Sequence, residues 1–147
     1  MSRIGFRIPK LYRYLLFTFL TLSWLTGSAF YYLNTWGEIE GPFGPEKHPA
    51  QFPILMAHGA GAFLILISFG AILTSHVPAG WKLGRSRYMG LTLVVLVTFQ
   101  IVTAYLLYYV AWAEGRTVLA NLHAAVGFSL PFLLIIHIWI GRNNRRS

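Results

Sequence analysis

The stretch PILMAHGAGAFLILISFGAILTSH, residues 53–76, decides the fold. It holds no Asp, Glu, Lys or Arg, and its length suits a membrane helix, which needs about 20 apolar residues to cross a bilayer. It also contains two histidines, His58 and His76. Because a strongly coordinating side chain is costly at membrane depth, each is a candidate functional residue. Their separation of eighteen residues makes about five helical turns, so both project from one face.

Three further apolar runs accompany this span, at about residues 11–33, 88–111 and 117–140. The first follows a basic start, but it is longer than a signal-peptide core and lacks a clear cleavage site, so we expect it to be retained. Pro78 and Gly80 predict that the second span ends after His76. The sequence therefore predicts an all-α fold, a transmembrane four-helix bundle forming a single membrane domain over residues 1–147.

The segments between the spans are predicted from their turn residues. Residues 34–52 contain six glycines and prolines and three glutamates, which predicts a turn-rich loop without regular structure. Glu114, Gly115 and Arg116 are expected to form a tight turn into the last span.

The composition agrees with a membrane protein and excludes several cofactors. The chain of 147 residues is 56% hydrophobic, with a mean hydropathy of +0.57. Lipid can solvate such a surface directly. The absence of cysteine excludes disulfides, thiolate-held iron–sulfur clusters and covalently attached c-type haem.

The formal net charge of +8 is a topology signal, and its arrangement argues against a nucleic-acid partner. Ten of the twelve basic residues fall on one side of a four-span arrangement: Arg3, Arg7, Lys10, Arg13, Lys82, Arg85, Arg87, Arg142, Arg145 and Arg146. Lys47, Arg116 and all four glutamates fall on the other. By the positive-inside rule, both termini are expected in the cytoplasm.

The last span repeats the histidine pattern with His123 and His137, fourteen residues apart. If both termini are cytoplasmic, the second and fourth spans run parallel, and His58 and His123 share an outer depth. Bis-histidine ligation of haem requires one imidazole on each face of the iron, supplied by facing helices. The pattern predicts one or two non-covalent haems b: an outer one on His58 and His123, and an inner one on His76 and His137.

Glycines near these histidines are candidate cofactor-binding residues, because they let a flat macrocycle approach the backbone. Gly61 follows His58, Gly127 follows His123, and Gly27 of the first span is a further candidate. For the glycines taken alone, close packing between membrane helices is the favoured explanation. A histidine likewise has an alternative role, a hydrogen bond across a helix interface, and His76 could be an interfacial residue.

With these histidines, the chain resembles the cytochrome b superfamily, in particular the amino-terminal four-helix bundle of the quinol–cytochrome c reductase cytochrome b. In that family the second and fourth helices each hold two haem-ligating histidines. LHAAVGFSLPFLLIIH, residues 122–137, is similar to the fourth-helix pattern. It also resembles the last helix of small bacterial four-helix cytochromes b, although their first-span histidine is absent here.

MAHGAGAF, residues 56–63, with the preceding GPFGPEKHP, is similar to short bacterial four-span proteins of no settled function.

One departure from the reductase pattern concerns the second span. The family spaces both histidine pairs by about thirteen or fourteen residues. With eighteen residues between them, the histidines of the second span lie about 6 Å farther apart along the helix than those of the fourth span, which argues against the inner pairing.

The resemblance implies an electron-transfer protein of the bacterial cytoplasmic (inner) membrane. Electrons would pass between a quinol pool or cytoplasmic donor and an outer-face redox partner, such as a c-type cytochrome or a reductase subunit, with quinone as a further candidate ligand. Two alternatives stay open. One is a haem-dependent oxidoreductase acting directly on a quinol or superoxide, and the other is a structural or metal-binding membrane subunit.

Overall fold

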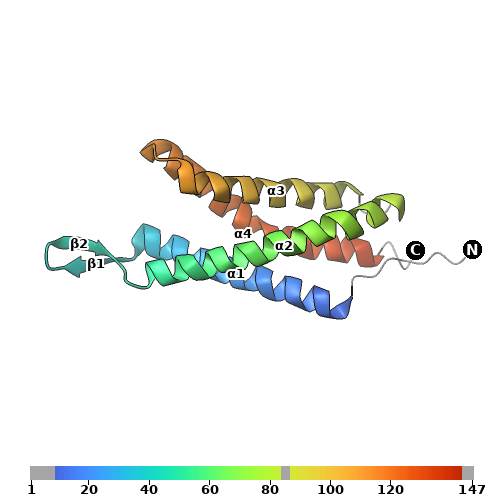
Figure 1. Ribbon diagram of the computed structural model, residues 1–147, viewed down its shortest axis with the longest axis horizontal. Helices are drawn as coiled ribbons and strands as arrows, with labels where there is room; N and C mark the ends of the chain where they lie inside the picture. The colour runs from blue at the N-terminus through green and yellow to red at the C-terminus, as the bar shows by residue number, and fades with distance from the viewer. Residues whose placement is uncertain (1–8, 84–86, 144–147) are drawn as a thin grey trace, which may run out of the picture. The chain divides into compact units, whose positions relative to one another are not determined.

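The computed structural model describes residues 9–83 and 87–143 (Figure 1). Its elements are α1 (Lys10–Trp36), β1 (Glu38–Gly41), β2 (Gly44–Lys47), α2 (Gln51–Leu83), α3 (Arg87–Tyr109) and α4 (Ala113–Asn143). Five arginines of the predicted charge asymmetry lie outside the described residues: Arg3, Arg7, Arg85, Arg145 and Arg146. The all-α prediction is confirmed, with one small hairpin added.

All four helices are long and apolar enough to cross a membrane, and their most apolar 18-residue windows have mean hydropathies from 1.2 to 2.1. Large apolar side chains lie on their surfaces, for example Ile67 at 72% exposed and Ile135 at 64%. Lipid is a suitable solvent for such faces, since the backbone polar groups are already paired inside the helices. The fold is therefore that of a multi-pass membrane protein in contact with lipid.

The contacts of the chain divide it into two compact units. Residues 10–68 form one unit, with α1, the hairpin and the first part of α2. The rest of α2 belongs with α3 and α4 to the other, in which α3 packs against α4. The single-domain organisation stays a prediction.

The segment between α1 and α2 is more regular than predicted, because β1 and β2 form an antiparallel hairpin. Gly41 pairs with Gly44 at its tip, and Gly44 has a φ of 123°, a conformation that glycine adopts without strain. Pro45 is tolerated since each strand of a two-stranded sheet has an unpaired edge. The glycines and prolines that predicted an irregular loop instead form a tight hairpin turn.

The base of the hairpin is tied to the helices that flank it. The side-chain oxygen of Asn34, near the end of α1, accepts hydrogen bonds from Lys47 Nζ at 3.2 Å and Gln51 Nε2 at 2.8 Å. Gln51 is the first residue of α2 and is 8% exposed. One amide therefore links the two helices and the second strand.

The prediction that the second span ends after His76 is wrong. The helix α2 continues to Leu83, with Pro78 inside it. A proline removes one backbone hydrogen bond, but membrane helices tolerate this because local adjustments and neighbouring groups re-satisfy the freed carbonyl. Lys82 then lies in the last turn, where a cation interacts favourably with the helix dipole. His76 is consequently a helical residue.

The predicted tight turn at residues 114–116 is also wrong, because α4 begins at Ala113. Glu114 lies in its first turn, where a carboxylate complements the helix dipole. Arg116 donates to the carbonyl of Leu107, in the last turn of α3, where helical carbonyls lack intrahelical partners. These two charges therefore stabilise the α3–α4 connection. At the other ends, the predicted spans and helices agree within four residues.

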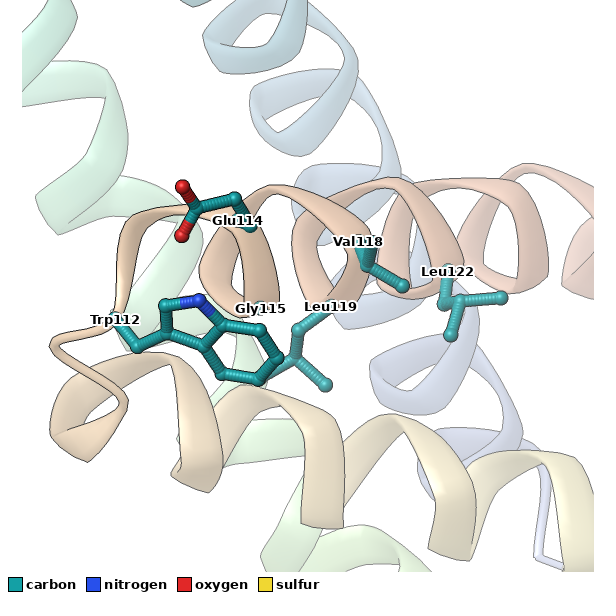
Figure 2. A pocket seen from close by; sticks show the side chains of 6 residues that line it. All are labelled: Trp112, Glu114, Gly115, Val118, Leu119 and Leu122. Atoms are coloured by element: carbon teal, nitrogen blue, oxygen red, sulfur yellow. The ribbon is translucent and has the colours of Figure 1, made fainter.

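An open pocket of about 280 Å³ lies at this connection, and Figure 2 shows the side chains that line it. The ring of Trp112 lies against the first turn of α4, over Gly115, where any side chain would collide with it. The other residues that line the pocket are Glu114, Val118, Leu119 and Leu122. The mostly apolar lining and the position at a helix end fit an interfacial surface, and no candidate histidine contributes to it.

Candidate functional site

His58 of α2 is held by α1. Its Nδ1 lies 2.9 Å from the backbone carbonyl oxygen of Ser23 and 3.4 Å from the Ser23 hydroxyl. A carbonyl oxygen can only accept a hydrogen bond, so Nδ1 bears the proton and Nε2 bears the lone pair. Ser23 is 8% exposed. A metal-ligating histidine has this arrangement, with one ring nitrogen donating to a carbonyl and the other presented as a ligand.

Two glycines allow this close approach of α1 and α2. A Cβ added to Gly27 would lie 2.8 Å from His58 Cε1 and 3.0 Å from its Nδ1, so the imidazole occupies the space of the missing side chain. A Cβ on Gly61 would lie 3.3 Å from Ser23 Cβ. Gly61, a candidate for cofactor approach, is therefore packed against α1 in this structure.

His123 of α4 is held by α3 in a similar way. Its Nδ1 lies 2.8 Å from Thr103 Oγ1. The same hydroxyl lies within hydrogen-bonding distance of two carbonyls of its own helix, those of Phe99 at 2.9 Å and Gln100 at 3.1 Å. When its single hydrogen goes to one of these carbonyls, the threonine oxygen accepts from His123 Nδ1–H, and Nε2 bears the lone pair. Thr103 is 3% exposed, the least exposed of the buried polar residues.

Gly127, one turn beyond His123, accommodates a side chain of α3. A Cβ at this position would lie 2.7 Å from Gln100 Nε2. The other amide atom, Gln100 Oε1, is buried with no hydrogen-bond partner among the described residues. The space above Gly127 is therefore filled by Gln100 in this structure, as in an ordinary close-packed helix pair.

His76 and His137 lie together. Their ring centroids are 6.3 Å apart and their planes are inclined at 86°. Nδ1 of His137 is buried and has no hydrogen-bond partner in the described part of the chain. Gly90 of α3 lies beside the same ring, since its Cβ would be 3.7 Å from His137 Cε1. The eighteen-residue spacing on α2 does not keep these two imidazoles apart.

The separation of these two rings has a chemical meaning. A metal–imidazole bond is about 2 Å long and the ring nitrogen lies about 1.2 Å from the ring centre, so imidazoles on opposite sides of one metal have centroids about 6.4 Å apart. The observed 6.3 Å is close to this value, and it also lies within the range of about 4.5–7 Å that is usual for packed rings. Steeply inclined ring planes are compatible with axial ligation, because each ring can rotate about its own metal–nitrogen bond.

No family model, curated protein or solved structure matches this chain. The resemblance to cytochrome b therefore stays a prediction, and the geometry of the histidines supports the function proposed below.

Two imidazoles form the protein ligand set of a bis-histidine haem. Structural zinc sites take four protein ligands, whereas a haem iron needs only two because the porphyrin supplies the other four. Within residues 9–83 and 87–143, no three His, Asp or Glu side chains gather where they could hold a metal ion. The donor set of two imidazoles thus fits a haem.

The other three histidines are His58, His123 and His48. His58 and His123 belong to different units, so their pairing stays a prediction. His48 accepts a hydrogen bond from the backbone N–H of Ala50 at 3.1 Å, just before α2. That contact gives it a local structural role at the helix start.

Sequence reasoning missed the polar partners of the histidines, Ser23 and Thr103. Both lie on spans that contain no intramembrane histidine, and small hydroxyl residues are common in membrane helices. One signal was available, because a buried imidazole in lipid requires a hydrogen-bond partner on a neighbouring helix. Spacing alone does not select these two among the many serines and threonines of the spans.

Proposed function

We propose that this protein is a b-type cytochrome of the bacterial cytoplasmic membrane that transfers electrons through bis-histidine haem. The observation that supports this most is the pair of imidazoles from His76 and His137, whose centroids are 6.3 Å apart. The Nδ1 contacts of His58 and His123 support it further, since a metal-ligating histidine donates a hydrogen bond from one ring nitrogen and binds the metal through the other.

The residues of the chain have defined tasks in this proposal. His76 and His137 would hold the haem iron, and ligation by two histidines would leave no position for oxygen or a substrate, which favours electron transfer. The bound haem supplies a one-electron iron couple. Gly90 leaves room beside the His137 ring, since a Cβ there would lie 3.7 Å from His137 Cε1.

The absorption spectrum of the purified protein tests this function. We expect a haem b spectrum whose bands sharpen on reduction and do not shift when carbon monoxide is added, because both axial positions are occupied. A colourless protein after expression with sufficient haem would contradict the proposal. Carbon monoxide binding to most of the haem would instead support the alternative of an oxidoreductase with an open coordination site.

The proposal includes a membrane orientation with both termini in the cytoplasm, based on the ten-to-two division of basic residues. A reporter inserted at the hairpin tip should be external, and one fused after residue 147 should be cytoplasmic. Phe43 at this tip is 100% exposed, so an insertion there disturbs no packing. A periplasm-active reporter at the carboxyl terminus would overturn the orientation.

Electron transfer requires partners, which we propose to be a quinol pool or cytoplasmic donor and a redox protein at the outer face. The hairpin bears three of the four glutamates and one lysine. Its strands pair Glu38 with Lys47, whereas the carboxylate of Glu46 lies over Gly41. The excess negative charge favours a basic partner such as a c-type cytochrome or a reductase subunit.

A further inference from the structure

The two spans without intramembrane histidines contact the outer histidines of their neighbours through the same ring atom. In α1 the acceptor is the carbonyl of Ser23, 2.9 Å from His58 Nδ1. In α3 it is the hydroxyl of Thr103, 2.8 Å from His123 Nδ1. Each acceptor belongs to a buried residue, so water does not compete for the contact.

We infer that Thr103 is a positioning residue that holds His123 in its Nδ1–H tautomer and thereby makes Nε2 the metal-ligating nitrogen. The Ser23 carbonyl does the same for His58. This inference rests on the proposed haem function, and it assigns α1 and α3 a task in it. A neutral imidazole otherwise exchanges between two tautomers, and only one of them presents a lone pair on Nε2.

The hydrogen bonds of Thr103 determine the direction of its contact with His123. Its hydroxyl lies within hydrogen-bonding distance of the carbonyls of Phe99 and Gln100, one turn back on the same helix, and we assign its single hydrogen to them. The oxygen is left as an acceptor toward α4. A threonine that bonds its own helix in this way is a fixed acceptor, because rotating the hydroxyl toward the histidine would abandon the helical carbonyls.

The expected consequence concerns both affinity and redox state. A hydrogen bond from Nδ1–H makes the imidazole a more basic ligand, which stabilises ferric iron. Loss of such a partner lowers metal affinity by about 10- to 100-fold in characterised sites. Thr103→Val keeps the shape of the side chain and removes the acceptor, so it should weaken haem binding at His123 and raise the midpoint potential.

The decisive measurement is histidine ¹⁵N NMR of the full chain purified without added haem, with His123 assigned from its absence in His123→Gln. Ring ¹⁵N shifts distinguish protonated from unprotonated nitrogens. We expect His123 to be the Nδ1–H tautomer in the wild type and in Thr103→Ser, and to lose this preference in Thr103→Val. Thr92→Val is the matched control, since Thr92 lies on α3, bonds only the carbonyl of Tyr88 and is exposed.

Redox titration of the haem-loaded protein gives the second readout. The midpoint potential should rise in Thr103→Val, return toward the wild-type value in Thr103→Ser, and be unchanged in Thr92→Val. An Nε2–H tautomer in the wild type would overturn the inference, and so would a Thr103→Val variant with unchanged tautomer and potential. The wild-type spectrum tests the inference without any Thr103 variant and needs only the His123→Gln protein for its assignment. The same spectrum separates a failure of this inference from a failure of the proposed function, because the tautomer of His123 is measured even in a protein that binds no haem.

Discussion

His137→Ala should lower the haem content of the purified protein by about one haem per chain, because it removes one of the two axial ligands of the inner site. His76→Ala should have the same effect, since the two rings lie 6.3 Å apart and both are proposed as ligands of one iron. Any inner haem that remains should bind carbon monoxide, as one axial position is then open. Haem content is measured by the pyridine haemochrome assay against protein concentration.

His48→Ala is the matched control, because this histidine lies before α2 and its Nδ1 contacts the backbone N–H of Ala50. Its haem content should equal that of the wild type. If His76→Ala keeps full haem content and axial ligation while His137→Ala loses haem, His76 is not a ligand. The inner pairing would then be wrong despite the observed ring distance.

Gly27→Leu should displace the His58 ring and weaken its ligation by about 10- to 100-fold, the usual effect of disturbing a ligand's supporting contacts. The physical cause is steric. A Cβ at this position would lie 2.8 Å from His58 Cε1, and the larger leucine leaves no room for the imidazole beside α1. The ring must move, and its hydrogen bond to the Ser23 carbonyl is lost. Haem titration of the variant measures the change.

Gly70→Leu provides the control for a glycine-to-leucine change in a membrane helix. An added Cβ at Gly70 of α2 meets no atom within 4 Å, so the leucine projects into open space. Its haem affinity should match the wild type. Equal affinity in Gly27→Leu would show that the contact between Gly27 and His58 is not needed for ligation.

The helices could be predicted from the sequence because lipid imposes a strong constraint on length and polarity. Apolar runs of about 20 residues gave all four spans. The errors lie where local turn residues were given too much weight. Pro78 was expected to end α2, yet a membrane helix accommodates a proline, and the helix continues to Leu83. Glycines and prolines after α1 form a paired hairpin instead of an irregular loop.

The sequence identifies the candidate ligands, whose ligation stays a prediction, but it does not identify their surroundings. His58, His76, His123 and His137 stand out because histidine is rare and costly in apolar spans. Their partners do not, since the choice of Ser23 and Thr103 depends on how neighbouring helices are rotated about their axes. The glycines illustrate the same limit, because Gly61 and Gly127 face protein atoms of α1 and α3. Such contacts follow from packing that periodicity does not specify.

Electron paramagnetic resonance of the oxidised wild-type protein tests the bis-histidine haem most directly. The His76 and His137 planes are inclined at 86°, so ligation by this pair should give a highly anisotropic low-spin ferric signal, which arises when axial imidazoles are nearly perpendicular. In His137→Ala this signal should disappear. A high-spin ferric signal from the wild type, or no ferric haem signal at all, would contradict the account.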